Sequence, residues 1–525
     1  MPKVLIADDI SEECARILRH GGVEVDHRGK MKPEDLKLAV APYEGLIVRS
    51  AVKVTKEIVE AGRSLKIIGR AGIGVDNIDQ EAATRRGIIV MNAPLGNITA
   101  AAEHAIALLL ANARNIVRAD VSIRNGKWER GAYTGVQLEG KTLGIVGLGK
   151  IGARMAAYGK AFNMRVVAYD PHLVRERAEV LGVELLEFDK MLQEADFITV
   201  HVPMTDRTRG MFGAREFGRM KKTARIVNTS RGGVIDEGAL HEALEKGAIA
   251  GAALDVFEQE PIPKEHPLLR NEKATLTPHL AASTQEAQVQ VAIDIANQFV
   301  EFFSNGVVRN ATNLASIGDP SIAAFVKLAE DLGSLAVQLS DGAVRGIELT
   351  YMGQIAGFDT DVVTQAAIKG VLRPAVGEGV NVVNARIAAK DRGVQVSEQR
   401  RKDARNYKSQ IAVRVETERG GRIVAGTLFE GREPRITQIN TLDLDLRPSR
   451  FMLYMQYPDV PGMIGKIGTI LGGHSINIAR MEVGRTGRGQ QAVILLTLDD
   501  PATPAALDEL RTSVQPLDIR SVTLT

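Results

Sequence analysis

The feature that most constrains the fold is a glycine-rich turn between two apolar strands, within residues 142–170. Three glycines, Gly147, Gly149 and Gly152, follow the first strand with the spacing G-x-G-x-x-G, and a helical pattern comes next. The second strand ends at Asp170. This order of strand, turn, helix, strand and acid predicts a parallel α/β sheet that binds a dinucleotide.

The chemistry of that turn favours NAD over NADP. Gly147 permits the tight turn, Gly149 leaves room for the pyrophosphate, and Gly152 lets helix and strand pack closely. The N-terminus of the helix offers N–H groups and a partial positive charge to the phosphates. Asp170 is placed to accept hydrogen bonds from ribose hydroxyls and to repel a 2′-phosphate. We therefore expect NAD as the cofactor; the alternative is a glycine-rich turn in an ordinary α/β protein.

Length and charge exclude several classes of protein. A chain of 525 residues is too long for one core and predicts about three or four domains. A net charge of +2 gives no strong field for nucleic acid or an anionic membrane. The sequence has no pattern typical of a signal peptide, and the apolar run at 108–110 is far shorter than a membrane span. The single cysteine, Cys14, excludes an intrachain disulfide and a cysteine-built metal site, and its setting predicts the inner face of a helix. We expect a cytoplasmic protein without metal, membrane or nucleic-acid partners.

Short apolar strands alternate with helical stretches in the first part of the chain. The strands are expected at 4–8, 45–49, 65–70 and 88–92. Connections long enough to hold a helix indicate a parallel, doubly wound sheet of the flavodoxin-like kind. An apolar helix follows over 99–115, with Thr99 as its expected cap, and leads into the Rossmann unit that contains the glycine turn.

The C-terminal part has a different character. Alternating polar and apolar strands predict an α+β intervening domain, in which the basic segment 398–408 is expected to be a solvated helix face. Residues 447–450 are expected to form a hinge, and Arg447 and Arg450 are candidates for a second anion site. The last residues have the order strand, helix, strand, strand, helix, strand, which is ferredoxin-like.

Four domains are therefore predicted. The boundaries of the substrate, cofactor, intervening regulatory and ferredoxin-like domains are expected at 1–97 with 281–312, 98–280, 315–448 and 450–525. The cleft between the first two is expected to hold the chemistry and to close over the substrate, with hinges near 95–98 and 279–284.

Three charged residues stand beside predicted strand ends, where α/β enzymes carry reactive groups: Arg231, Glu260 and His279. Histidine is suited to moving a proton near neutral pH, and a carboxylate on its other nitrogen would fix its tautomer. Arginine can bind a substrate carboxylate through two hydrogen bonds. The trio is consistent with hydride chemistry on a 2-hydroxy acid, although a strand-end histidine is also often structural.

The motifs GLGKIG, NTSRGGVIDE, DVFEQEP and TPHLAAST occur in this order, and the chain resembles the D-isomer-specific 2-hydroxyacid dehydrogenases over roughly residues 1–310. The stretch DVPGMIGKIGTILGGHSINI is similar to an ACT domain, a small amino-acid-sensing module. The segment between them resembles the additional domain of the long family members that act on D-3-phosphoglycerate. The resemblance implies NAD-dependent oxidation of that substrate to 3-phosphohydroxypyruvate, the first step of L-serine biosynthesis, by a homotetramer.

The resemblance also assigns roles to residues, with Arg231, Glu260 and His279 as the catalytic group. It places cofactor contacts, besides the glycines and Asp170, at Lys150, Ile151, Thr229, Ser230 and Asp255. It places substrate contacts at Arg49, Arg70 and Asn97, and contacts to an L-serine effector at Tyr457, Asp459 and Asn477. A substrate with a carboxylate and a phosphate needs several converging cations, which is consistent with Arg49 and Arg70 at strand ends.

Two other functions stay open. One is another D-2-hydroxyacid dehydrogenase, which would reduce glyoxylate, hydroxypyruvate or 2-oxoglutarate with the same trio; the long C-terminal part disfavours it. The other is a non-enzymatic protein that senses NAD, which the complete trio disfavours. The ACT-like tail could likewise serve only for dimerisation rather than for binding serine.

Overall fold

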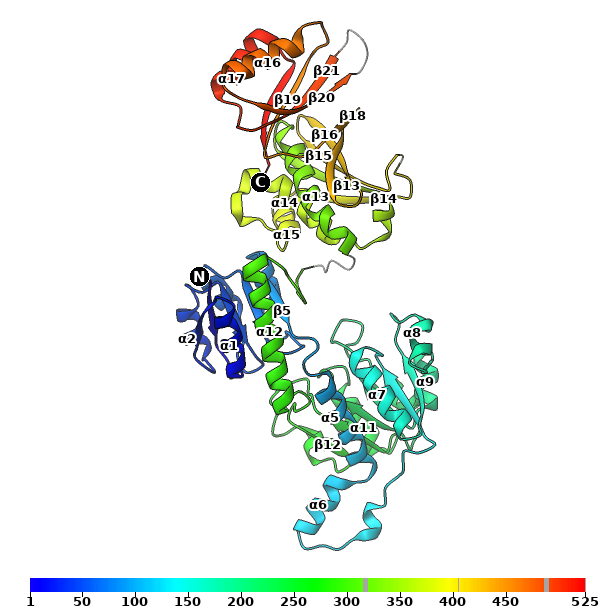
Figure 1. Cartoon of the computed structure of the whole chain (residues 1–525). Coiled ribbons are helices and arrows are strands. Elements are labelled where there is room, and N and C mark those ends of the chain that lie inside the picture. The colour runs from blue at the N-terminus through cyan, green and yellow to red at the C-terminus, as the bar shows by residue number, and fades with distance from the viewer. Residues whose placement is uncertain (315–319, 405, 486–490, 525) are drawn as a thin grey trace.

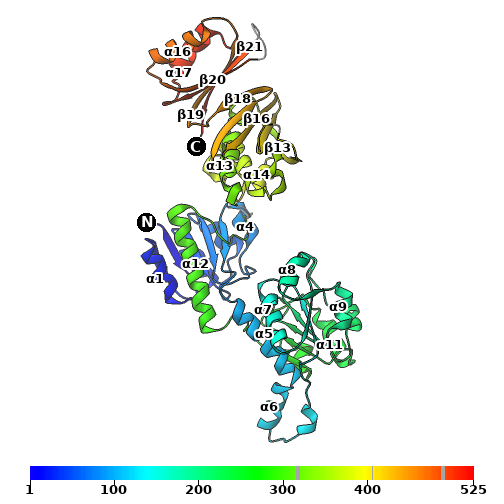
Figure 2. The same cartoon turned by 45° about the vertical axis from the view of Figure 1, so that its right-hand side comes forward.

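Four sheets organise the computed structural model, which describes residues 1–314, 320–404, 406–485 and 491–524 (Figure 1). Figures 1 and 2 show an elongated molecule with the ferredoxin-like unit at one end and a projecting helical arm at the other. Within the described ranges, no helix is long and apolar enough to cross a membrane. The predicted fold class, two parallel α/β units followed by an α+β unit and a ferredoxin-like unit, is confirmed.

The first sheet is parallel and has the flavodoxin-like strand order β2-β1-β3-β4-β5. Its strands are β1 (Lys3–Ile6), β2 (Glu24–His27), β3 (Gly45–Val48), β4 (Ile67–Arg70) and β5 (Ile89–Asn92). Its helices are α1 (Glu12–His20), α2 (Pro33–Ala39), α3 (Lys56–Ala61), α4 (Gln80–Arg85) and the returning α12 (Gln285–Asn305). Cys14 is buried on the inner face of α1, as predicted. Strand β2 was not predicted, because an edge strand with the sequence EVDH carries only one apolar side chain.

The second sheet is also parallel, with the order β12-β11-β10-β9-β6-β7-β8. Its strands are β6 (Thr142–Val146), β7 (Arg165–Tyr169), β8 (Glu184–Leu185), β9 (Phe197–Val200), β10 (Arg225–Asn228), β11 (Gly251–Leu254) and β12 (Ala274–Leu276). Its helices are α5 (Ile98–Ala113), α7 (Lys150–Ala161), α8 (Arg175–Val180), α9 (Phe188–Glu194), α10 (Ala214–Arg219) and α11 (Glu237–Glu245). Strands β9 and β7 flank β6, so the strand order reverses beside the glycine turn, where α/β sheets bind ligands.

Helix α5 connects the first two sheets, and it begins one residue earlier than predicted. Its first residue is Ile98, so the prediction of Thr99 as the cap is wrong. Asn97 occupies the cap position, although its side chain makes no capping hydrogen bond in the described part of the chain. Beyond α5, helix α6 (Ile116–Arg124) forms the arm that projects from the second sheet (Figures 1 and 2).

The third sheet is mixed, with the order β14-β13-β15-β16-β17-β18. Its strands are β13 (Val344–Gly353), β14 (Gln395–Arg401), β15 (Ser409–Thr417), β16 (Gly420–Phe429), β17 (Glu433–Ile439) and β18 (Leu442–Leu446). Its helices are α13 (Pro320–Gln338), α14 (Asp361–Val376) and α15 (Ala385–Asp391). The prediction of a helix over 398–408 is wrong, because this segment begins in β14. An edge strand exposed on both faces shows no apolar alternation that sequence analysis could detect.

The fourth sheet is antiparallel, with the order β20-β21-β19-β22. Its elements are β19 (Phe451–Pro458), α16 (Met463–Gly473), β20 (Ile478–Arg485), β21 (Gln491–Leu498), α17 (Pro504–Val514) and β22 (Asp518–Thr523). One face of this sheet packs on α16 and α17. The other face shares a core with the third sheet, in which Met452, Tyr454 and Leu495 join Leu444 and Leu446. The two C-terminal units are therefore packed against each other across 447–450.

Short 3-10 helices complete the described secondary structure at Arg130–Tyr133, Pro267–Arg270, Gln354–Gly357 and Gly377–Gly379.

Candidate active site

A pocket of about 490 Å³ lies where the first two sheets meet. The ends of β3 and β4 contribute Arg49 and Arg70, and the cap of α5 contributes Asn97. The loops that follow β11 and β12 contribute Glu260 and His279. Five residues that the sequence singled out for substrate binding and catalysis therefore line one pocket.

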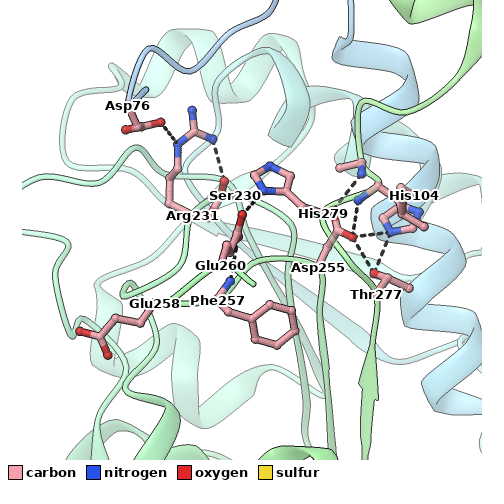
Figure 3. Close-up of polar contacts among 12 residues, drawn as sticks. Asp76, His104, Ser230, Arg231, Asp255, Phe257, Glu258, Glu260, Thr277 and His279 are labelled. Carbon is pink, nitrogen blue, oxygen red and sulfur yellow. Dashed lines mark hydrogen bonds and ion pairs between the residues drawn. The ribbon is translucent and has the colours of Figure 1, made fainter. Parts of the chain in front are cut away.

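Glu260 and His279 form a hydrogen-bonded pair in this pocket. Nδ1 of His279 lies 2.7 Å from Oε2 of Glu260, as Figure 3 shows. The other carboxylate oxygen accepts the backbone N–H of Phe257 at 3.1 Å. Burial raises the pKa of Glu260, but the hydrogen bonds from His279 and Phe257 outweigh burial and lower the pKa overall. Because an ionised carboxylate can only accept, Nδ1 of His279 carries a proton, and Nε2 is not used in this hydrogen bond.

Arg231 lies beside the same pocket, and its side chain donates hydrogen bonds to residues of both domains. Its Nε donates to Oδ2 of Asp76 at 3.1 Å, and its Nη1 donates to the carbonyl oxygen of Ser230 at 2.7 Å (Figure 3). Asp76 belongs to the loop after β4, whereas Arg231 follows β10. The ion pair therefore bridges the cleft between the two sheets.

Arg70 is a half-buried cation that forms no ion pair with the described residues. Burial, followed by the charges of Arg231 and Arg49, lowers the pKa of Arg70 to about 10. Its Nε is buried and finds no hydrogen-bond partner among the described residues. An anion in the pocket would supply the missing partner, and it would relieve the repulsion among the three cations.

The glycine turn has the shape that a dinucleotide requires. Gly147 has a φ of +89°, and a Cβ there would lie 2.6 Å from the carbonyl oxygen of His201. A Cβ at Gly152 would lie 2.2 Å from the carbonyl oxygen of Gly147, whereas one at Gly149 would meet no described atom within 4 Å. Gly149 caps α7, which begins with Lys150 and Ile151. The turn thus packs tightly on the sheet and stays open where a pyrophosphate would lie.

Two further groups fit the rest of the cofactor. The carboxylate of Asp170 is held at the end of β7, where it accepts the backbone N–H of Leu148 at 2.9 Å and of His172 at 3.0 Å. Thr229 is buried, and its hydroxyl has no hydrogen-bond partner within the described residues. Ser230 is less available, since its hydroxyl donates to Oδ1 of Asn228 at 2.7 Å. The unpartnered hydroxyl of Thr229 is the observation that best fits a bound nicotinamide ring.

Asp255 differs from the other predicted cofactor residues because protein donors surround its carboxylate. The residue is fully buried at the end of β11. It accepts hydrogen bonds from His104, Thr277, Leu280 and Ala281. Its carboxylate thus anchors the loop that carries His279.

The predicted effector residues are only partly brought together. Tyr457 and Asp459 line a pocket of about 440 Å³ in the ferredoxin-like unit, and Arg485 lies 3.6 Å from Asp459. Asn477 lies outside this pocket, and its side-chain amide donates to Asp499 at 2.6 Å. A site made of all three residues would therefore need a second chain.

The second anion site predicted around 447–450 is not assembled. Arg447 forms an ion pair with Glu433, and the guanidinium of Arg450 lies over the ring of Phe451.

Sequence analysis missed Asp76 and His104, whose partners lie 155 and 151 residues away along the chain. One weak feature of the sequence could have indicated His104: it is an ionisable residue within the apolar helix TAAAEHAIALLL. Among the described residues, no group of three histidine, cysteine or acidic side chains is arranged to hold a metal ion.

Family models match three segments of the chain. The NAD-binding domain of the D-isomer specific 2-hydroxyacid dehydrogenases matches residues 106–281. The D-3-phosphoglycerate dehydrogenase intervening domain matches 321–440, and the ACT domain matches 451–513. The resemblance inferred from the motifs is thereby confirmed.

Several curated relatives match along nearly the whole chain. D-3-phosphoglycerate dehydrogenase from Archaeoglobus fulgidus is 45% identical over 97% of both chains. The enzyme of the same name from Bacillus subtilis is 40% identical over 95% of both.

Solved structures match a little over half of the chain. A glyoxylate reductase from Paecilomyes thermophila is 30% identical, with a TM-score of 0.55 over 59% of this chain and 98% of that chain. D-lactate dehydrogenase from Escherichia coli is 27% identical, with a TM-score of 0.53 over 59% of this chain and 100% of that chain. The part of this chain that these structures match is thus common to enzymes named for different substrates, whereas the two full-length relatives are both named D-3-phosphoglycerate dehydrogenase. The chain therefore belongs to the D-3-phosphoglycerate dehydrogenase family, and it contains the NAD-binding domain of the 2-hydroxyacid dehydrogenases.

Proposed function

We propose that this protein oxidises D-3-phosphoglycerate to 3-phosphohydroxypyruvate with NAD, as the first step of L-serine biosynthesis. The observation that carries the proposal is the buried Nε of Arg70, which has no hydrogen-bond partner among the described residues and belongs to a side chain lining the pocket of the Glu260–His279 pair. The names of the full-length relatives support the same substrate. A 2-hydroxy acid with a phosphate would bring two anionic groups to three arginines, whereas glyoxylate or lactate would bring one.

The residues of the pocket have separate tasks in this reaction. Glu260 keeps the proton of His279 on Nδ1, which leaves Nε2 to accept the proton of the substrate hydroxyl. Arg231 binds the substrate carboxylate through two N–H groups. Arg49 and Arg70 bind the phosphate, and Asn97 orients the substrate from the cap of α5.

The second sheet binds the cofactor in this proposal. Gly147, Gly149, Gly152 and the first residues of α7 hold the pyrophosphate, Asp170 holds the ribose, and Thr229 with Ser230 contact the nicotinamide side. When bound there, NAD accepts the hydride that leaves the substrate carbon. Substrate recognition is assigned to residues 1–97 with 281–312, and cofactor binding to 98–280. Residues 315–448 and 450–525 are assigned to regulation.

A spectrophotometric assay tests this function directly. NADH formation from D-3-phosphoglycerate is measured while the product is removed, because the oxidation is energetically uphill. Reduction of glyoxylate, hydroxypyruvate and 2-oxoglutarate is measured with NADH in parallel. A higher kcat/KM for 3-phosphohydroxypyruvate than for these three acids supports the proposal, whereas preference for one of them assigns the other dehydrogenase function.

We also propose a homotetramer in the cytoplasm. The arm that contains α6 exposes Ile116, Val117, Val121, Ile123 and Trp128, which are side chains that a second copy could cover. Light scattering of the Val121→Asp variant tests this idea, since loss of the assembly is expected if the arm forms a subunit interface.

L-serine is the proposed effector of the ACT domain. Tyr457 and Asp459 would contact serine from one chain, and Asn477 would come from a second chain. Asp459 would pair with the amino group of serine. Titration calorimetry with L-serine tests the proposal, and an absence of heat at millimolar serine would leave the ACT domain with an assembly role only.

A further inference from the structure

The helix that connects the two domains carries a histidine bound to the loop of the catalytic pair. Nε2 of His104, in α5, lies 3.1 Å from Oδ1 of Asp255 and 3.1 Å from Oγ1 of Thr277. The side chain of His104 is 21% exposed, whereas that of Asp255 is fully buried. Figure 3 shows the His104 ring pointing at this carboxylate, on the side away from Glu260.

The Asp255 carboxylate fixes the chain on both sides of His279. Before His279, the hydroxyl of Thr277 donates to Oδ1 at 2.6 Å. After it, the backbone N–H of Leu280 donates to Oδ1 at 2.7 Å, and that of Ala281 donates to Oδ2 at 2.8 Å. The N–H of His279 itself donates to the carbonyl oxygen of Asp255 at 2.9 Å. One buried residue thus determines the path of the whole turn.

The turn needs such an anchor because its backbone is strained. His279 has a φ of +55°, in the left-handed region that residues other than glycine seldom adopt. A residue held in that region persists only where surrounding contacts enforce it. If the contacts to Asp255 loosen, the imidazole of His279 will leave its position against Glu260.

The contacts determine which nitrogen of His104 is protonated. The hydroxyl hydrogen of Thr277 is used in its bond to Asp255, so the oxygen of Thr277 can only accept from the His104 ring. The carboxylate of Asp255 also only accepts. Nε2 of His104 is therefore protonated and donates toward both oxygens.

Helix α5 links this donor to the substrate pocket. Asn97 caps the helix and lines the pocket, and His104 lies seven residues further along the chain. Seven residues correspond to about two helical turns, so both positions lie on one face of α5. A displacement of the helix as the substrate engages Asn97 would be transmitted to the anchor of His279.

We propose that His104 is a positioning residue for the proton-transfer step: it orients the Asp255 carboxylate and, through it, the turn that holds His279 against Glu260. The proposal rests on the dehydrogenase function proposed above, with His279 as the acid–base group. It gives Asp255 a role in orienting His279.

The first test compares His104→Leu with His104→Gln in the full-length enzyme. The leucine variant removes the donor, and we expect kcat to fall by roughly 10- to 100-fold, as small misplacements of reacting groups do. The Kd for NADH, measured by fluorescence, should stay within about twofold because the donor acts on the loop of His279. Glutamine can place an N–H group near the position of Nε2 and should restore most of kcat. The control is Glu103→Gln, a change at the exposed neighbouring residue on the same helix.

The second test asks whether His104 acts through His279. In a His279→Gln background, adding His104→Leu should cause little further loss of single-turnover rate, because residues that act as one unit are not additive. An equal loss in both backgrounds, or a leucine variant with wild-type kcat, would overturn the proposal.

A third measurement does not depend on activity. Amide hydrogen exchange of the peptide that contains Leu280 and Ala281 should be faster in His104→Leu than in His104→Gln or in the wild type. Unchanged exchange would contradict the proposed anchoring even if kcat falls. If the wild type oxidises no 2-hydroxy acid but the exchange still responds, the proposed function fails while the anchoring of the turn stands.

Discussion

The pocket lined by Arg70 and the pocket of the ACT domain differ in whether their charged groups already have partners within the chain. In the first, the Nε of Arg70 is buried, has two further arginines nearby, and finds no hydrogen-bond partner in the described chain. In the second, Asp459 already lies within 3.6 Å of Arg485, and the third predicted residue is bound elsewhere. A single chain therefore holds all the residues that the proposed function assigns to substrate chemistry, and Arg70 is placed to meet an anion. The three residues of the proposed serine site are not brought together within a single chain.

The largest expected effect tests whether the first pocket is a catalytic centre. Replacement of His279 by alanine should lower kcat by roughly 10²- to 10⁴-fold, because it removes the acid–base group. NADH binding, measured by fluorescence, should be unchanged. Wild-type turnover in this variant would end the assignment of His279.

The second largest effect tests whether Arg70 binds the phosphate of the substrate. Arg70→Met should raise KM for 3-phosphohydroxypyruvate by about 10- to 100-fold, the value of a charge-assisted hydrogen bond at a buried site. KM for unphosphorylated hydroxypyruvate should change far less. Arg63→Met, at an exposed position, is the matched control. Equal effects on both substrates would argue against phosphate recognition by Arg70.

A third prediction concerns the pH dependence of stability in the cleft. Burial raises the pKa of Asp255, but hydrogen bonds from His104, Thr277 and two backbone amides outweigh burial and lower it overall. The lowered pKa of Asp255 stabilises the fold at pH values above the pKa of the unfolded state, which is about 3.9. This stabilisation is lost as the pH falls through the pKa of the folded state. Asp255→Asn should therefore cost about 1–3 kcal/mol of unfolding free energy at neutral pH and less in acid. Urea unfolding at both pH values measures this, and a pH-independent cost would contradict the prediction.

A smaller effect tests the second pocket. Asp459→Asn should weaken L-serine binding about tenfold in titration calorimetry, because a single charge-assisted contact is lost at a partly open site. Asp508→Asn, on the exposed side of α17, serves as the control. Equal binding in both variants would remove Asp459 from the effector site.

The smallest effect concerns the ion pair across the cleft. Asp76 is 72% exposed and Arg231 is 29% exposed, and exposed pairs of this kind contribute at most about 1 kcal/mol. Asp76→Asn should change KM by no more than about fivefold and leave kcat intact. A larger loss of kcat would give Asp76 a direct part in holding Arg231 for catalysis.

Much of the fold could be predicted because its signals are local. The glycine turn, the buried strands of the parallel sheets and the ferredoxin-like order all depend on residues close together in sequence. Strand β14 could not be predicted, because the polar sequence QVSEQRR becomes a strand only by pairing with β13. The partners of His104 and Arg231 could not be predicted either, since both contacts join segments more than 150 residues apart.

The core shared by the third and fourth sheets has a consequence for protein engineering. A cut between Leu446 and Phe451 would expose Tyr454 and Leu495 to water on one fragment and Leu444 on the other. The ACT domain moved alone into another protein would therefore expose an apolar patch and tend to aggregate. The smallest part that can be transferred with this core intact is the pair of C-terminal units together.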